Sequence, residues 1–66
     1  MSEEGVVKSY SRRSGYGFVI PDSGGHDVFF HVTAVKGFEP GPGIRVKFQL
    51  AQGRRGPEAK NLEESK

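Results

Sequence analysis

The sequence predicts a small all-β fold, and three observations favour it. Short runs rich in aromatic and β-branched residues recur along the chain, and such runs are typical of strands. Ten glycines and four prolines separate these runs at short intervals. No segment has a helical period of useful length, apart from one possible helical turn at 33–36. Because closing the strands on themselves removes unpaired edges, we expect a β-barrel.

Turn signals set the limits of each expected strand. A polar turn follows the first run, and the Pro-Asp-Ser-Gly-Gly segment at 21–25 is a strong turn signal after the second. The segment 39–43 alternates proline and glycine and cannot hold regular structure, so 33–43 should be a loop. The five expected strands lie at 5–11, 15–20, 27–32, 44–50 and 58–62.

Alternation along the strands indicates which side chains form the core, because successive side chains point to opposite faces. The segment 44–50 alternates apolar and polar residues without a fault. Its predicted inward residues are Ile44, Val46, Phe48 and Leu50. The predicted inward residues of the second and third strands are Val19, Val28 and Phe30.

This choice of core leaves several ring side chains in water. The outward positions of the second and third strands hold Tyr16, Phe18, Phe29 and His31. Exposed rings gathered on one face of a 66-residue chain indicate a binding partner with flat faces that can stack on them. Unpaired nucleobases fit, because stacking of a base on an aromatic ring stabilises by about 1–3 kcal/mol and tolerates any base.

The charge distribution also favours a polyanionic partner. The net charge is only +2, but nine basic residues face four acidic ones between Gly5 and Leu62. Such an excess of positive charge on the folded part of the chain attracts nucleic acid.

Length and composition restrict the class of protein further. We expect one domain over 1–66, since 66 residues leave no room for a second. The chain has no cysteine, which excludes disulfides and thiolate metal sites and suits the cytoplasm. No apolar run approaches the ~20 residues of a membrane span, and the acidic N-terminus does not resemble a signal peptide.

Four motifs resemble those of the cold-shock domain family. The family's Lys-Gly-Phe-Gly-Phe-Ile corresponds to Ser-Gly-Tyr-Gly-Phe-Val at 14–19, and its Val-Phe-Val-His-Phe to Val-Phe-Phe-His-Val at 28–32. The opening Gly-x-Val-Lys at 5–8 and the closing Gly-Pro-x-Ala-x-Asn at 56–61 match in order and spacing. The resemblance, which covers about 5–62, implies a five-stranded antiparallel OB-fold barrel that binds single-stranded RNA and DNA.

The chain departs from the family pattern at three positions that bear on binding. Ser9 stands where the family usually has Trp, Ser14 where it has Lys, and Val32 where it has an aromatic residue. Two stacking groups and one cation are therefore missing. Arg12 and Arg13 in the adjacent turn could restore the charge, and arginine can itself stack on bases.

The rings and the resemblance together define a candidate nucleic-acid interface. The expected stacking residues are Tyr10, Tyr16, Phe18, Phe29, His31 and Phe38, the last carried over across a gap in the alignment. The cations expected to frame these rings are Lys8, Arg12, Arg13 and Arg55. Lys8 is two residues before Tyr10, so both side chains are expected on the same face of the strand. The two cations of the fourth strand, Arg45 and Lys47, are expected to be solvated charges or weak steering groups.

Neither catalysis nor metal binding is indicated by the sequence. His31 would need further ligands to hold a metal, and only His26 and scattered carboxylates are available. A nuclease would need an acidic cluster for metal-assisted phosphoryl chemistry, and the chain has none. We expect no catalytic residue, no cofactor and no small-molecule substrate.

The sequence therefore predicts a non-enzymatic, monomeric, cytoplasmic protein that binds single-stranded RNA and DNA with low sequence specificity. The resemblance implies an RNA chaperone that destabilises RNA secondary structure and thereby affects transcription or translation. The alternative is a protein-interaction module that uses the same aromatic face. A steep salt dependence of binding would separate the two, because it is expected for phosphates and not for an apolar protein patch.

Overall fold

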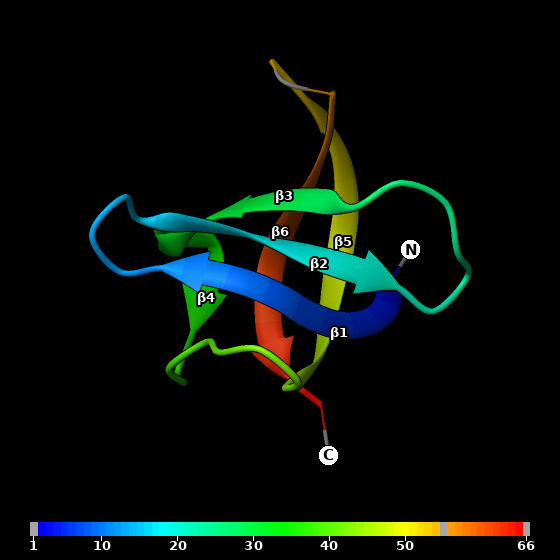
Figure 1. Cartoon of the computed structure of the whole chain (residues 1–66). Coiled ribbons are helices and arrows are strands. Elements are labelled where there is room, and N and C mark those ends of the chain that lie inside the picture. Colours follow the sequence, from blue (N-terminus) through cyan, green and yellow to red (C-terminus); the bar gives the residue numbers. More distant parts are fainter. Residues whose placement is uncertain (1, 55, 66) are drawn as a thin grey trace.

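The computed structural model describes residues 2–54 and 56–65, and its strands form one curved sheet that closes into a barrel (Figure 1). A 3₁₀ helix, Val32–Ala34, lies between the third and fourth strands. It overlaps the single helical turn expected at 33–36. The strands are β1 (Ser2–Ser11), β2 (Tyr16–Pro21), β3 (Val28–His31), β4 (Val35–Lys36), β5 (Arg45–Gly53) and β6 (Gly56–Glu64).

The five long strands are the five that the sequence predicts, and their order is β3-β2-β1-β5-β6. Neighbours in this order pair antiparallel, and β3 then pairs with β6 to close the barrel. The closing pair, Phe29 with Glu58, is parallel. This pair has to be parallel. Five strands that alternate in direction end on a strand that runs the same way as the first, so β3 and β6 point in the same direction. The expected antiparallel barrel is thus confirmed in four of its five long pairings.

Three of the strands, β1, β5 and β6, are longer than the sequence predicts. β1 begins at Ser2, because Ser2–Glu4 pairs with β5 although its side chains are polar and show no alternation. The short strand β4 was not expected; it pairs in parallel with the end of β6. β5 and β6 continue together beyond the barrel to the pair Gly53 with Gly56, as a ribbon that projects in Figure 1.

The core inside the barrel contains most of the predicted inward residues. Val19, Val28, Phe30, Val46 and Phe48 are buried, as predicted. β1 adds Val7, and β6 adds Ala59 and Leu62. A compact set of side chains from all five long strands therefore holds the barrel closed.

The predicted core is wrong at Leu50 and only partly right at Ile44, which are the two ends of the predicted segment 44–50. Ile44 is only partly buried, and Leu50 is 48% exposed. Leu50 has the inward parity, but the β1–β5 pairs within the described part of the chain reach only to Gln49, so no described residue of β1 lies opposite Leu50. The strand continues into the β5–β6 ribbon, whose inner face is open to water.

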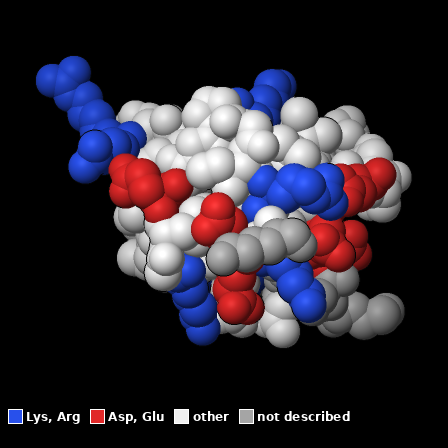
Figure 2. All heavy atoms as spheres, turned by 90° about the horizontal axis from the view of Figure 1, so that it is seen from below, with Lys and Arg blue, Asp and Glu red and all other residues white. Residues whose placement is uncertain are grey.

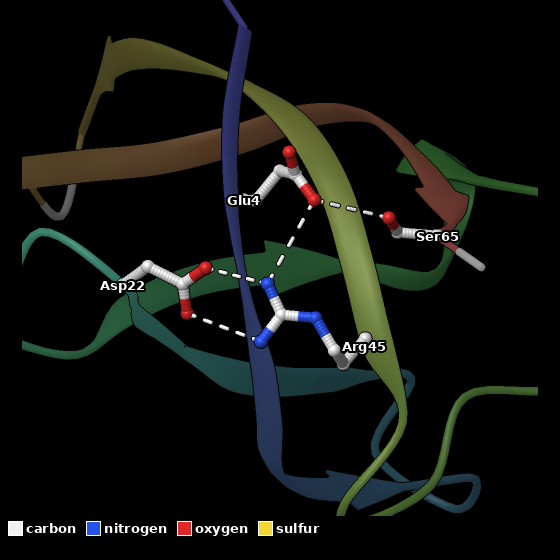
Figure 3. A network of polar contacts seen from close by, with 4 residues as sticks. All are labelled: Glu4, Asp22, Arg45 and Ser65. Carbon is white, nitrogen blue, oxygen red and sulfur yellow. Dashed lines mark hydrogen bonds and ion pairs between the residues drawn. The ribbon is translucent and has the colours of Figure 1, made fainter.

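An ion-pair network ties the N-terminal part of β1 to the rest of the barrel (Figure 3). The Arg45 guanidinium contacts the Asp22 carboxylate at 2.5 and 3.4 Å and the Glu4 carboxylate at 3.7 Å. Ser65 donates its hydroxyl to Glu4 at 3.0 Å. The hydrogen bond to Asp22 and the two negative charges raise the pKa of Arg45 above its usual value. Arg45 is therefore an ion-paired charge whose side chain is still 49% exposed to solvent, and its expected steering role stays a prediction.

Candidate nucleic-acid interface

The outward side chains of β2 and β3 form a cluster of rings that we call the ring face, consisting of Tyr16, Phe18, Phe29 and His31. In the register of these strands Tyr16 lies opposite His31, and Phe18 lies opposite Phe29. Directly opposed residues of an antiparallel pair share a face, so all four point away from the core. The structure thus brings together the four outward rings that the sequence predicts.

Three of these rings touch one another. The ring centroids lie 5.5 Å apart for Tyr16 and Phe29, 6.0 Å for Phe18 and Phe29, and 6.4 Å for Tyr16 and Phe18. Tyr16 is 37% exposed, and the other two rings are half-buried because they pack on their neighbours. These are favourable aromatic distances, so the cluster is held in place without help from the core.

A glycine beneath the ring face lets the barrel close tightly there. Gly17 is buried, and a Cβ on it would collide with the Ser9 carbonyl and lie 2.8 Å from Phe30 Cζ. Only a residue without a side chain allows β1 and Phe30 to approach β2 this closely. Gly17 therefore helps to hold the two ring-bearing positions on either side of it, Tyr16 and Phe18.

Tyr10 does not belong to the ring face. The β1–β2 register passes from Val7 opposite Val19 to Ser9 opposite Phe18, which makes Lys8 the extra residue of a β-bulge.

The bulge reverses the parity of the following residues. Tyr10 consequently lies opposite Gly17, on the core side, where its ring stacks on Phe30 at 5.8 Å and 10°. The expectation that Tyr10 lies on the same face of the sheet as Lys8 and the ring face is wrong. Simple alternation along one strand does not take a bulge into account.

The same bulge brings Ser9 and Ser11 onto the ring face, where they lie opposite Phe18 and Tyr16. Both serines are exposed. Sequence analysis missed them as surface residues of the site, although a signal was present. Val7 and Tyr10 are three residues apart and both apolar, so they can share the core side only if a bulge lies between them.

The cations expected to frame the rings are mostly engaged with carboxylates. Lys8 Nζ lies 2.8 Å from the Asp27 carboxylate, and Arg12 Nε lies 3.1 Å from the Glu39 carboxylate. All of these side chains are substantially exposed, so the pairs are weak and open to competition from phosphates.

Two further cations, which lie in the β1–β2 turn and at the tip of the β5–β6 ribbon, are exposed and have no ion pair among the described residues. These are, in that order, Arg13 and Arg54. Arg55, which the sequence predicts as a contact, lies outside the described residues. Figure 2 shows the molecule from below, on the side away from the tip of the β5–β6 ribbon. Basic and acidic side chains are intermixed on this side.

Phe38 lies in the loop after β4 and is half-buried against the core. It makes no ring contact with the ring face among the described residues. Its neighbour Glu39 is the residue that pairs with Arg12, so this loop and the β1–β2 turn approach each other at one edge of the face. A stacking role for Phe38 stays a prediction.

His31 has a defined hydrogen-bonding state. Its Nδ1 accepts the backbone N–H of Thr33 at 3.2 Å, which caps the 3₁₀ helix, and lies 3.0 Å from the Thr33 hydroxyl. In the neutral ring the proton then resides on Nε2. No group of three or more metal-ligating side chains occurs within 2–54 and 56–65.

No helix within the described part of the chain is long and apolar enough to cross a membrane.

Comparison with known proteins agrees with this geometry. Residues 3–65 match the family model described as the 'Cold-shock' DNA-binding domain. The chain is 41% identical over 61 residues to the cold shock-like protein CspG of Escherichia coli K12 and to the cold shock protein CspV of Vibrio cholerae. Each of these matches covers 88% of this chain and 87% of the relative.

Two Drosophila proteins are also similar, and this chain spans about a third or less of each. It is 51% identical over 47 residues to the cold shock domain-containing protein CG9705 of Drosophila melanogaster, covering 70% of this chain and 33% of that protein. A solved structure, drosophila Unr CSD456, superposes with a TM-score of 0.84 at 22% identity, over 100% of this chain and 27% of that one. The latter supports the fold alone.

These matches cover the ring-bearing strands and nearly all of the barrel, and the family consists of nucleic-acid-binding modules and not of enzymes. The chain belongs to the cold-shock DNA-binding domain family.

Proposed function

We propose that the protein binds single-stranded RNA and DNA on the ring face, with low sequence specificity, and acts as an RNA chaperone. The observation that carries this proposal is the contact cluster of Tyr16, Phe18 and Phe29 on the outer side of the barrel. These rings are not needed to fill the core, which is complete beneath them. Each can offer a face or edge to an unpaired base.

The charges around the ring face fit a phosphate backbone. Arg13 and Arg54 are free to neutralise phosphates, and Lys8 and Arg12 can exchange their exposed carboxylate partners for them. Between two and four phosphates neutralised on a single strand give a salt slope of roughly −1.4 to −3. A duplex would bind more weakly, because its bases are stacked on one another and present no free face.

Binding of the open strand is sufficient for chaperone activity. A protein that binds single strands but not a hairpin shifts the equilibrium toward the open form by RT ln(1 + [L]/Kd). At a hundredfold excess over Kd the shift is about 2.7 kcal/mol, enough to open a weak hairpin without ATP. Such melting is the route by which the protein would affect transcription or translation. We also propose that it acts as a cytoplasmic monomer.

The test is an anisotropy titration of fluorescein-labelled oligo-U, oligo-dT and a duplex of equal length at several salt concentrations. We expect the two single strands to bind, with the salt slope given above, and the duplex to bind more weakly. A hairpin that carries a fluorophore and a quencher reports the melting directly. Light scattering on the same samples gives the oligomeric state.

Leu50→Ala is the matched control for ring-face variants, because Leu50 is a large exposed apolar side chain that lies off the ring face. Phe18→Ala should weaken single-strand binding and Leu50→Ala should not. Binding that is independent of salt, or equal weakening by both substitutions, would contradict the proposal and favour an apolar protein partner.

A further inference from the structure

We propose that the end of the barrel at the base of the β5–β6 ribbon binds a small arylalkylamine. The ring of the ligand enters an apolar pocket, and its ammonium group pairs with Glu3. The pocket opens on the inner side of the sheet, whereas the ring face lies on the outer side. The inference therefore goes beyond nucleic-acid binding and does not rest on it.

A pocket of about 220 Å³ opens where β1 begins and the loop between β2 and β3 passes. Its lining includes Val28 and Phe48, which also belong to the core, and the apolar side chains of Leu50, Pro21 and Pro57. In Figure 1 this end of the barrel is on the right, where the N-terminal end of β1 and the β2–β3 loop lie close to β5. The exposed side chain of Leu50 is therefore part of a concave apolar surface.

The volume of the pocket fits a ligand with one aromatic ring and a short side chain. A cavity of about 150 Å³ in a protein core holds benzene, so ~220 Å³ has room for roughly nine heavy atoms against the six of benzene. Phenethylamine is a molecule of this size. The mouth of a β-barrel is also a common place for a small-molecule site, whose walls are mostly apolar and whose few polar groups orient the ligand.

Glu3 is the polar group that selects the charge of the ligand. It lies opposite Phe48 in the β1–β5 register, so the two side chains share the inner face of the sheet. The same face of β1 continues with Gly5 and Val7, which are both buried. Glu3 itself is partly buried and has no hydrogen bond or ion pair with any residue of 2–54 or 56–65. A carboxylate that faces inward without a partner favours a cationic ligand.

The other polar side chains of the pocket do not oppose a cation. Ser23 and His26 come from the β2–β3 loop, and a hydroxyl or a neutral imidazole can accept a hydrogen bond from an ammonium group. Among the described residues, no Lys or Arg lines the pocket. Glu3 therefore sets the charge of the described lining at neutral pH, and an amine should be preferred over a carboxylic acid of similar size.

The next residue of β1 provides a matched control. Glu4 points to the outer side of the sheet, where its carboxylate lies 3.7 Å from the Arg45 guanidinium and accepts the Ser65 hydroxyl at 3.0 Å. Glu3→Gln and Glu4→Gln thus make the same chemical change on the two faces of one strand. Only Glu3→Gln should alter the charge preference of the pocket.

The test is an NMR titration of the whole chain at neutral pH with three compounds of similar size. These are phenethylamine, which is cationic, 2-phenylethanol, which is neutral, and phenylacetate, which is anionic. We expect phenethylamine to bind with a Kd of roughly 1 mM. It should shift the signals of His26, Val28 and Leu50 and leave those of Tyr16 and Phe18 in place. Phenylethanol should bind roughly 3- to 10-fold more weakly, and phenylacetate more weakly still.

Three variants connect the binding to the pocket. Glu3→Gln should reduce the affinity for phenethylamine to that for phenylethanol, whereas Glu4→Gln should keep the preference for the amine. Leu50→Ala should weaken the binding of phenethylamine and phenylethanol alike, because both lose the same apolar contact.

Four results would overturn the inference. They are the absence of saturable shifts at roughly tenfold the expected Kd, shifts confined to the ring face, equal affinity for the three compounds, and a preference for the amine that survives Glu3→Gln. Oligo-dT binding is measured separately and is expected to be the same with and without phenethylamine. Failure of this inference therefore leaves the proposed function intact.

Discussion

Two regions on the outside of the barrel are built in opposite ways. The ring face on β2 and β3 consists of touching aromatic side chains with few ion pairs at its border. The region around Arg45, between β1 and β5, consists of the ion pairs of Arg45 with Glu4 and Asp22 and of a hydrogen bond from Ser65 to Glu4 (Figure 3).

The two regions differ in what their side chains can still bind. In the Arg45 network each charge already has an opposite charge within reach, so the network has little to offer a partner. On the ring face the aromatic surfaces are only partly covered by one another. We therefore propose that the Arg45 region contributes to the stability of the barrel and that the ring face binds the ligand, and each proposal can be tested separately.

The largest expected effect comes from the core that both regions share. Phe48 is 1% exposed, so Phe48→Ala should destabilise the fold by about 3–5 kcal/mol. In a domain of this size such a loss unfolds much of the protein, and binding disappears together with the Arg45 network. Circular dichroism melting checks this. A melting temperature equal to that of the wild type would place Phe48 outside the core.

On the ring face, removal of one ring should separate binding from stability. Phe18→Ala and Phe29→Ala should each weaken single-strand binding by about 1–3 kcal/mol, because one stacked base loses its partner. The melting temperature should change less than for Phe48→Ala, since both rings lie outside the core. Anisotropy titration and thermal melting of the same samples give both quantities. Unfolding, or unaltered affinity, would show that the two faces of β2 and β3 are assigned wrongly.

A ring added beside Phe18 should extend the stacking surface of the ring face. Ser9 lies opposite Phe18 and is exposed, so Ser9→Trp should tighten binding by at most the ~1–3 kcal/mol of one stacked base. Ser14→Trp, in the turn, is the matched control and should gain less. Equal gains from both would mean that any added ring helps and that the register of β1 does not matter.

The smallest expected effect belongs to the Arg45 network. Arg45→Met should lower the melting temperature slightly at low salt and hardly at all at high salt, because exposed ion pairs are weak and screened. Single-strand affinity should stay within error, apart from the loss of one distant charge. A loss of affinity comparable to that of Phe18→Ala would mean that nucleic acid also contacts this region.

Much of this architecture could be predicted from the sequence, because strand alternation and turn residues are local properties. They placed Val19, Val28 and Phe30 in the core and Tyr16 with Phe18 outside it. The resemblance to cold-shock domains added the expectation that the five strands form an antiparallel OB-fold barrel.

The features that could not be predicted depend on how the strands pair and on which distant residues they bring together. The bulge at Lys8 is established by the β1–β2 register, and it places Tyr10 inward and Ser9 and Ser11 outward. Leu50 is exposed although it has the inward parity, and it lies one residue beyond the described β1–β5 pairs. The ion pairs of Lys8 with Asp27 and of Arg12 with Glu39 join residues far apart in the chain, so no local pattern showed them.

The most direct test of the central claim is a chemical-shift map of the backbone amides during titration with an oligo-dT hexamer. The account predicts large shifts on the ring-bearing strands, around residues 9–11, 16–18 and 29–31, and small ones around Arg45 and Ser65. Leu50, exposed and apolar but off the ring face, should also stay unperturbed. Shifts concentrated around Arg45 or Leu50, with residues 16–18 and 29–31 unaffected, would contradict it.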